Sequence, residues 1–278
     1  MARADALCLR ATGTAIALLV SACGYTPPDR APAAPPTRAS LPADPTPQPE
    51  PRSRYGNGPV YEVFGQRYEV LASSYGYQER GVASWYGKKF HGRPTSSREP
   101  YDMYAMTAAH KTLPLPTYVE VHNLSNNRRI VVKVNDRGPF VDNRIIDLSY
   151  AAALKLGMVR DGTSLVEVRA ISFDVAPQGT RAEPPQVVEE RAPITPRDKS
   201  TSRVFVQAGA FGDRRNAARR HRLLRDNGID TAFVHEEARG DSALYRVRVG
   251  PIDGVAQYDD VVNRLNAIGI ADTHLVTD

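Results

Sequence analysis

The placement of proline divides this chain into folded and unfolded parts. Ten of its 22 prolines fall between Pro27 and Pro51, among alanine, threonine and serine with no hydrophobic period. A second weakly apolar stretch, 176–202, carries more prolines and mixed charge. Such segments cannot bury a core and are expected to stay extended and disordered. The sequence therefore predicts a tether at 23–58, an extension at 59–80, a first domain at 81–175, a linker at 176–202 and a second domain at 203–278.

The first 22 residues are typical of an export signal. A short, positively charged start precedes an apolar run, 11–20, that is too short to span a bilayer. The following Val20-Ser21-Ala22-Cys23 resembles the bacterial lipobox, whose cysteine is acylated and becomes the first mature residue. We therefore expect a membrane anchor at Cys23. Gly24 stands where an aspartate typically retains such proteins at the inner membrane, which favours the outer membrane.

Cysteine content and charge exclude several classes of function. Cys8 lies in the export signal, and an acylated Cys23 leaves no thiol for a disulfide, a nucleophile or a zinc-thiolate site. The formal net charge of +5 on an exported chain suits acidic polymers of the cell envelope. We expect no nucleic-acid partner and no cofactor.

Short apolar segments bounded by turn residues predict a small, mainly β barrel in the first domain. One helix is expected at Ser149–Leu156, where Asp147 is a candidate cap and Gly157 a stop. The tyrosine-rich Val60–Tyr77 is expected to pack as an edge extension. The predicted strands are Gly81–Tyr86, Tyr104–Ala108, Thr117–Asn123, Arg129–Asn135 and Leu165–Phe173.

The second domain alternates strands with two amphipathic helices. Apolar residues recur at helical spacing in 214–227 and 255–267, and each helix stops at a glycine. The strands are expected at 204–208, 231–235, 244–249 and 273–276. This β-α-β-β-α-β order predicts a ferredoxin-like α+β domain.

Six blocks of polar and aromatic residues stand in order along the first domain. They are Trp85-Tyr86-Gly87, Phe90 to Thr95, Glu99 to Asp102, Thr107 to Pro114, Asn135 to Phe140 and Arg144 to Ser149. Together they resemble the rare lipoprotein A family. The resemblance implies a double-psi β-barrel and a lytic transglycosylase that cleaves glycan strands lacking stem peptides.

Four carboxylate and histidine positions carry the chemistry that this resemblance implies. The residues required in the family fall on Glu99, Asp102 and His110, and Asp136 matches the aspartate shared with other double-psi barrel enzymes that cleave polysaccharides. Arg98 departs from the family, which usually has glycine there. Such a change affects the backbone of the loop or adds a contact to an anionic sugar group.

Breaking a glycosidic bond requires an acid that protonates the leaving oxygen. In a lytic transglycosylase the muramyl C6 hydroxyl replaces water, so one well-placed acid can suffice and the product has a 1,6-anhydro end. We expect Asp136 to be that acid, because it ends a strand beside a glycine, with Asp102 and His110 positioning it or the sugar. Glu99 is the rival acid if its apolar neighbours raise its pKa.

Other residues of these blocks have two possible roles. Tyr86 and Tyr101 are expected to offer rings to sugar faces, as does Trp85 unless it fills the barrel core. Arg137 either binds substrate or braces Asp136.

A metal site is the alternative use of the histidines and aspartates. The candidates are His91, His110, His122, Asp102 and Asp136. Their spacings match no standard ligand pattern, so no metal is expected.

The second domain carries a further resemblance. Val204–Phe211 and Tyr245–Pro251 are similar to the sporulation-related repeat (SPOR) domain, which implies binding of denuded peptidoglycan at division sites. Strand alternation turns Phe205, Gln207 and Gly209 outward, and likewise Leu244, Arg246 and Arg248. A ring, an amide and two guanidiniums then share a face that suits a glycan. The arginines of helix 214–227 are expected to form a solvated face.

The sequence therefore predicts a lipid-anchored, endolytic lytic transglycosylase of the periplasm. Its partners would be peptidoglycan glycan strands and, through Cys23, the membrane. The second domain would bring it to the division septum. An expansin-like scaffold that binds glycan without cleaving it is the main alternative, and a hydrolase that uses water is another.

Overall fold

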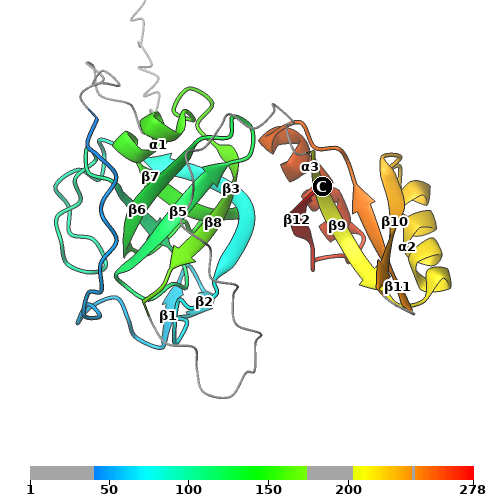
Figure 1. The fold of residues 1–278 in the computed structure, drawn as a ribbon, viewed down its shortest axis with the longest axis horizontal. Helices are drawn as coiled ribbons and strands as arrows, with labels where there is room; N and C mark the ends of the chain where they lie inside the picture. The colour runs from blue at the N-terminus through cyan, green and yellow to red at the C-terminus, as the bar shows by residue number, and fades with distance from the viewer. Residues whose placement is uncertain (1–40, 174–202, 240–241) are drawn as a thin grey trace, which may run out of the picture.

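The computed structural model describes residues 41–173, 203–239 and 242–278. Two separate domains occupy these ranges (Figure 1). The predicted export signal, the anchor at Cys23 and the linker at 176–202 lie outside the described residues.

The first domain is a closed, six-stranded barrel (Figure 1). Its order around the barrel is β3-β7-β4-β6-β5-β8, with parallel pairing of β3 to β7 and of β4 to β6. The strands are β3 (Gln78–Tyr86), β4 (Thr107–His110), β5 (Thr117–Asn123), β6 (Arg129–Asp136), β7 (Arg144–Ser149) and β8 (Ser164–Ile171). The small β barrel predicted from the short apolar segments is confirmed.

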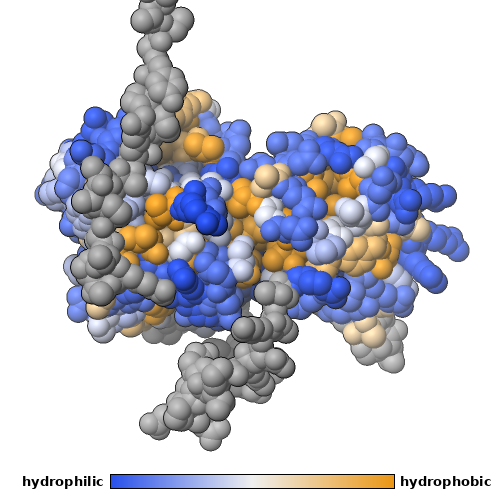
Figure 2. All heavy atoms as spheres, turned by 90° about the horizontal axis from the view of Figure 1, so that it is seen from above, coloured by the Kyte–Doolittle hydropathy of each residue, from blue (hydrophilic) through white to orange (hydrophobic). Residues whose placement is uncertain are grey.

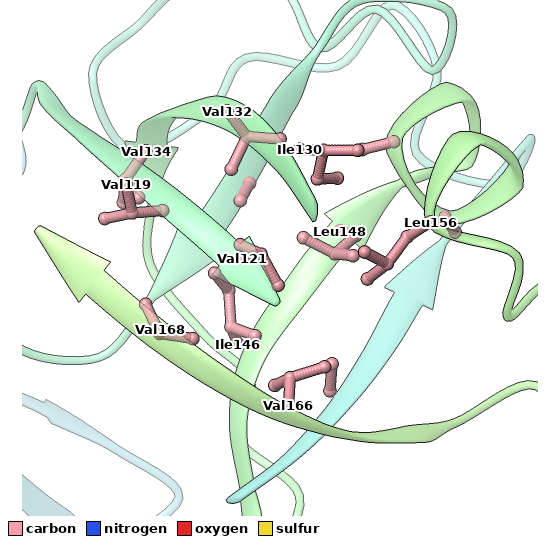
Figure 3. Packing of buried hydrophobic residues seen from close by; sticks show 14 of the residues in the cluster. Val119, Val121, Ile130, Val132, Val134, Ile146, Leu148, Leu156, Val166 and Val168 are labelled. Carbon is pink, nitrogen blue, oxygen red and sulfur yellow. The ribbon is translucent and has the colours of Figure 1, made fainter. Parts of the chain in front are cut away.

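Alternating side chains fill the barrel interior. Val119 and Val121 of β5 and Val132 and Val134 of the neighbouring strand β6 all point into the core, and all four are fully buried (Figure 3). This follows from the two-residue period of a strand, which sends every second side chain inward. Some of the residues between these core positions, such as Lys133 of β6 and Asp147 of β7, are only partly buried.

Helix α1 (Tyr150–Leu156) closes one end of the barrel. Its N-cap is Ser149, whose side chain accepts a hydrogen bond from the Ala152 N–H. The helix stops at Gly157, which has φ 82°. The expectation that Asp147 caps this helix is wrong, because Asp147 lies two residues earlier, within β7.

Residues 41–58 run along one side of the barrel, in blue in Figure 1. Leu41 packs against the barrel core, the Val131 N–H donates to Asp44 Oδ2 at 2.9 Å, and Lys133 Nζ lies 2.8 Å from Glu50 Oε2. The expectation of a free tether therefore fails for this part of the chain. Proline keeps the segment extended, as expected, but regularly placed polar anchors attach it to the barrel.

A two-stranded hairpin follows this segment. It consists of β1 (Val60–Val63) and β2 (Gln66–Glu69), paired antiparallel. Tyr61 of β1 donates a hydrogen bond to the Lys111 carbonyl oxygen at 2.7 Å. The stretch thus contacts the barrel as a separate two-stranded sheet and does not extend an edge of the barrel sheet, which is closed.

The second domain has the predicted β-α-β-β-α-β order, and its sheet order is β10-β11-β9-β12. Arg246 of β11 pairs with Ala210 of β9, and Arg248 pairs with Gln207. A step of two residues on β11 therefore matches a step of three on β9, so β9 has one extra residue at this point. Gly209, with φ 144°, lies in this bulge, so Ala210 rather than Gly209 continues the outward face. The elements are β9 (Val204–Phe211), α2 (Arg214–Asp226), β10 (Ala232–Arg239), β11 (Ser242–Val249), α3 (Val255–Ala267) and β12 (His274–Thr277).

The two domains are in contact. Val82 and Leu165 of the barrel join the apolar cluster of the second domain, and Arg144 Nη2 lies 3.3 Å from Asp259 Oδ2. Figure 2 shows apolar surface on both domains, bordered by hydrophilic residues. Among the described residues, no helix has the length and apolar character needed to cross a membrane.

Candidate active site

Asp136 ends strand β6 in a network of donors. Its Oδ1 accepts hydrogen bonds from the Ser96 N–H at 2.8 Å, the Ser96 hydroxyl at 2.7 Å and the Arg137 N–H at 2.7 Å. Three donors on one oxygen stabilise negative charge on this carboxylate and fix its orientation. Asp136 is therefore held as a pre-organised anion at the end of the strand.

The Arg137 side chain points away from this carboxylate. Nε and Nη2 donate to the Gly56 carbonyl oxygen at 2.9 and 2.7 Å, and Nη2 also donates to Asn57 Oδ1 at 3.3 Å. Nη1 donates to the carbonyl oxygens of Leu113 and His110 at 2.5 and 3.2 Å. A guanidinium has five N–H donors, and all five are directed at protein acceptors. The guanidinium therefore neither pairs with Asp136 nor is free to bind substrate, and it instead ties the N-terminal segment to the loop after β4.

A second carboxyl group lies two strands from Asp136. Ala109 of β4 pairs with Asp136 on one side and with Asp147 of β7 on the other. At about 4.8 Å per strand, this places the two backbones roughly 10 Å apart. Gly138 has φ 137°, and a Cβ there would lie 3.9 Å from Asp147 Oδ2, so glycine leaves the approach to that carboxyl open.

The environment of Asp147 differs from that of Asp136. Burial raises the pKa of Asp147, although the hydrogen bond from the Ser84 hydroxyl and the positive charge of Arg144 oppose the shift. The charge of Asp136 adds to the increase. Sequence reasoning missed Asp147 as a functional candidate, and its position within an Ile-Ile-Asp-Leu strand was the available signal, because a carboxyl on a buried strand is unusual.

Tyr86 and Tyr101 lie beneath this site. Their rings are stacked with centroids 4.1 Å apart, and the Tyr101 hydroxyl donates to the Tyr86 carbonyl oxygen. Tyr101 is only 3% exposed, and burial together with the charges of Asp136 and Asp147 raises the pKa of Tyr86. Both rings are buried, so neither is presented as an open platform for a sugar. Trp85 is partly buried between these rings and the barrel core.

Glu99 lies beside Asp136 on the loop between β3 and β4. Its Oε2 accepts a hydrogen bond from Asn135 Nδ2 at 2.7 Å, and its Oε1 is 3.5 Å from Lys133 Nζ. The side chain is 48% exposed, so its apolar neighbours do not bury it. The apolar surroundings that the sequence suggested for Glu99 are therefore absent.

Asp102 lies on the rim of the same loop. Its Oδ1 accepts a hydrogen bond from the Tyr104 N–H at 2.9 Å and is 3.7 Å from His91 Nδ1. The His91 Nδ1 in turn accepts from the Met103 N–H at 3.2 Å. Asp102 is thus exposed to an incoming strand and also shapes the turn that carries it.

Arg98, where the resemblance noted above implies glycine, has φ 74°. A residue with a Cβ in this left-handed conformation costs about 1–2 kcal/mol. The Arg98 guanidinium lies 5.1 Å from the ring centroid of Tyr55, in the segment that crosses the barrel, and this cation–π contact offsets part of the cost. The loop therefore keeps the glycine-type backbone that places Glu99.

His110 is a buried hydrogen-bonding centre, with 2% of its surface exposed. Its Nδ1 accepts from the Thr112 and Leu113 N–H groups at 3.1 and 3.0 Å, and its Nε2 lies 2.7 Å from the Tyr77 hydroxyl. Because Nδ1 accepts, we assign the proton to Nε2. Burial lowers the pKa of His110 to about 3, with the charge of Arg137 contributing. The ring is neutral at physiological pH and positions the backbone whose carbonyl groups hold Arg137.

The outward face of the second domain is crowded. Phe205 meets Phe233 edge to face at 5.5 Å, and Phe205 is only 3% exposed. Arg246 Nη1 donates to Gln207 Oε1 at 3.2 Å, and its Nε lies 2.6 Å from Glu237 Oε2. The expected open ring and free amide are therefore packed among their neighbours.

A cavity of about 680 Å³ opens on this face, lined in part by Phe205, Phe233 and Arg248. The Arg248 side chain is mostly buried, and its Nε has no hydrogen-bond partner among the described residues. Sequence reasoning missed Phe233 and also His235, which lines the same cavity. Phe233 of β10 lies directly opposite Arg248 of β11. This pairing of strands, which would have placed Phe233 on the same face, is not visible in the sequence. Elsewhere in the described ranges, no group of three or more histidine, cysteine or acidic residues is arranged to hold a metal ion.

Comparison with known proteins identifies the family. The family described as lytic transglycolase matches residues 78–168, and the SPOR domain matches residues 200–275. The endolytic peptidoglycan transglycosylase RlpA of Pseudomonas aeruginosa PAO1 is 35% identical over 254 residues, covering 76% of this chain and 73% of that protein. The chain belongs to the RlpA family.

Two other RlpA proteins match a smaller part of this chain at higher identity. RlpA of Vibrio cholerae serotype O1 is 56% identical over 131 residues, which cover 47% of this chain and 49% of that protein. RlpA of Neisseria meningitidis MC58 is 55% identical over 111 residues, covering 40% of this chain and 46% of that protein. The chain thus spans about half the length of these relatives. Membership of the RlpA family confirms the predicted double-psi barrel followed by a SPOR domain.

Proposed function

We propose that the barrel domain is an endolytic transglycosylase that cleaves the bond between N-acetylmuramic acid and N-acetylglucosamine in peptide-free glycan strands. The observation that carries this proposal is the pair of carboxyl groups, Asp136 and Asp147, on either side of Ala109. Glycosidic bond cleavage needs one group that gives a proton and negative charge that stabilises an oxocarbenium-like centre. The P. aeruginosa, V. cholerae and N. meningitidis relatives all bear the name of this activity.

The different surroundings of the two carboxyl groups suggest how the roles divide. Asp147, whose pKa is raised by burial, is suited to hold the proton that goes to the bridging oxygen. Asp136, with three donors on Oδ1, is suited to remain charged and to stabilise the positive sugar. The muramyl C6 hydroxyl then bonds to C1 and returns its proton to the acid. One bond to C1 breaks and one forms, no water is consumed, and the product has a 1,6-anhydro end.

The loop residues have supporting roles in this proposal. Glu99 and Asp102 are exposed on the rim, where they can accept hydrogen bonds from sugar hydroxyls. His110 and Arg137 do not reach the substrate and act as positioning residues. The proton donor expected from the sequence, Asp136, is therefore replaced in this proposal by Asp147.

The SPOR domain would hold the enzyme on its substrate. The cavity between Phe205, Phe233 and Arg248 combines rings for sugar faces with a guanidinium for a lactyl carboxylate or an acetamido oxygen. Family membership implies a periplasmic protein associated with the cell wall. Anchoring at Cys23 in the outer membrane and enrichment at the division septum are further parts of this proposal.

Mass spectrometry of peptide-free glycan strands tests the proposed cleavage. The soluble mature chain is compared with Asp136→Asn, with Asp147→Asn and with Asp161→Asn, which changes an exposed aspartate outside the site. We expect anhydro-ended fragments from the parent and from Asp161→Asn, and almost none from the other two. Hydrated reducing ends would indicate a hydrolase. Intact strands that co-sediment with the parent protein would indicate a binding scaffold.

A further inference from the structure

A hollow lies between the N-terminal segment and the barrel, and its lining includes Ser96 and Arg137. It has a volume of about 300 Å³. Gly56, Gly58, Tyr61 and Val63 supply one wall, and the barrel supplies the other. This first wall precedes residues 78–168, the part that matches the lytic transglycolase family. The hollow is therefore formed by the N-terminal segment and the catalytic domain together.

The walls of the hollow are aromatic and fixed in place. The Tyr61 ring stacks on Tyr68 at 5.2 Å and meets Phe140 at 6.3 Å, and Phe140 also contacts Tyr68 at 5.6 Å. The guanidinium of Arg137 lies 5.8 Å from the Tyr61 ring centroid. Tyr61 is further held through its hydroxyl by the Lys111 carbonyl oxygen. Rings with defined positions lose little entropy when a ligand binds to them.

Ser96 connects this hollow to the catalytic carboxylate. It lines the hollow and also donates both of its hydrogen bonds to Asp136. Gly56 packs against the same residue, since a Cβ at Gly56 would lie 2.9 Å from the Ser96 carbonyl oxygen. A ligand bound in the hollow would therefore contact Ser96, which is itself hydrogen-bonded to the Asp136 carboxylate.

The residues that line the hollow indicate which kind of ligand it can bind. The surface is mainly hydrocarbon and aromatic, and the N–H donors of Arg137 are already engaged by protein acceptors. A pyranose ring presents C–H groups on one face, which pack on aromatic rings. Pockets for small molecules range from about 300 to 1,000 Å³, so this hollow suits one sugar unit and not a longer stretch.

We propose that Gly56, Gly58, Tyr61 and Val63 of the N-terminal segment form, together with Phe140, a saccharide subsite that takes the apolar face of one N-acetylhexosamine unit of the glycan strand. This inference rests on the proposed function, because it assigns a place to the same substrate. It makes the N-terminal segment part of the substrate groove and not only a connection to the membrane.

Filling the hollow tests the subsite. Val63 shares a strand face with Tyr61, so Val63→Trp directs a large ring into the hollow, whereas Glu62→Trp places the same ring on the opposite face of β1. Cleavage of peptide-free strands is measured as a function of strand concentration. We expect Val63→Trp to raise KM at least tenfold with a smaller change in kcat, and Glu62→Trp to stay within twofold of the parent.

A second variant and a binding measurement keep the outcomes distinct. Phe140→Leu removes a ring while leaving an apolar wall, and we expect it to raise KM severalfold even if Val63→Trp does not fold. Calorimetric titration with a purified peptide-free tetrasaccharide is made on the Asp136→Asn background with and without Val63→Trp. The proposed subsite would be overturned if KM were unchanged in Val63→Trp and in Phe140→Leu and if Val63→Trp did not change the affinity for the tetrasaccharide. A parent protein that binds the tetrasaccharide but cleaves nothing would overturn the proposed reaction while the binding comparison still decides the subsite.

Discussion

The carbonyl oxygen of Gly56 accepts two hydrogen bonds from the guanidinium of Arg137, at 2.9 Å from Nε and 2.7 Å from Nη2. Gly56 comes from the segment that crosses the barrel, and Arg137 follows Asp136 in the chain. The backbone of the N-terminal segment therefore holds the residue that follows Asp136, the carboxylate of the proposed active site. This coupling makes the segment a structural part of that proposed site.

Replacing Gly56 with alanine should destabilise the fold by more than the strain of its left-handed backbone alone. Gly56 has φ 75°, which costs a residue with a Cβ about 1–2 kcal/mol. A Cβ there would also lie 2.8 Å from Leu115 Cδ1 and 2.9 Å from the Ser96 carbonyl oxygen. Gly65 has a similar φ of 77° with nothing within 4 Å of its Cβ position, so Gly65→Ala is the matched control.

Thermal unfolding and strand cleavage of both alanine variants measure the difference. We expect Gly65→Ala to lose about 1 kcal/mol and to keep its activity, because only the strain is added. Gly56→Ala should lose more stability and most of its activity, since Ser96 must move away from Asp136. Equal losses in the two variants would show that the contact with Ser96 is unimportant.

The raised pKa of Asp147 predicts both a pH profile and a stability effect. A carboxyl whose pKa is higher in the folded state than in the unfolded state stabilises the fold below about pH 4, and this contribution is lost as the pH rises through the folded-state pKa. Activity should fall over the same range, because the acid loses its proton. Asp147→Asn stays neutral, so we expect it to weaken this pH dependence of unfolding.

Urea unfolding between pH 4 and 8, together with kcat, checks the prediction for Asp147. We expect kcat of Asp147→Asn to fall about 10²- to 10⁴-fold, the usual contribution of a general acid. An Asp147→Asn protein with normal kcat would return the proton-donor role to Asp136 or Glu99.

The lowered pKa of His110 predicts that its contribution to the stability of the fold changes with pH in the opposite direction to that of Asp147. Its pKa falls from 6.5 to about 3 through burial, so its contribution to stability is fully present above pH 6.5 and is lost as the pH falls toward 3. Each pH unit within this window costs about 1.4 kcal/mol from this one group. His110→Gln should be less stable at pH 7 and should show a shallower loss of stability on acidification.

The control for this variant is His274→Gln, because His274 is largely exposed. At pH 7 we expect His274→Gln to lose much less stability than His110→Gln, because an exposed side chain makes few contacts. The two histidine variants are compared by urea unfolding at several pH values, and by KM and kcat at pH 7. A His110→Gln protein with unchanged stability and a changed pH optimum for kcat would make His110 an acid or base and not a positioning residue.

Local sequence patterns were sufficient for most of the fold. Two-residue alternation in β5 and β6 and the helical spacing in α2 and α3 reflect contacts close in the chain, so strands and helices could be assigned from them. The surroundings of Asp147 could not be predicted in this way, because Ser84, which donates a hydrogen bond to it, and Asp136, whose charge affects it, come from other strands. The attachment of residues 41–58 was missed for a similar reason, since their proline content indicates an extended chain but does not show what anchors it.

Arg98 provides a test of how the chain tolerates a side chain at a glycine position. The backbone strain at φ 74° is partly offset by the contact of its guanidinium with Tyr55. Arg98→Ala keeps the strain and loses the contact, so it should lose about 0.5–1 kcal/mol, the usual range for an exposed cation–π pair. Arg98→Gly removes both, and we expect it to be at least as stable as the parent and fully active. The measurement is thermal unfolding of both variants in the parent and in Tyr55→Ala, where Arg98→Ala should no longer destabilise. An Arg98→Gly protein that loses activity while keeping its stability would instead place this side chain in contact with the glycan.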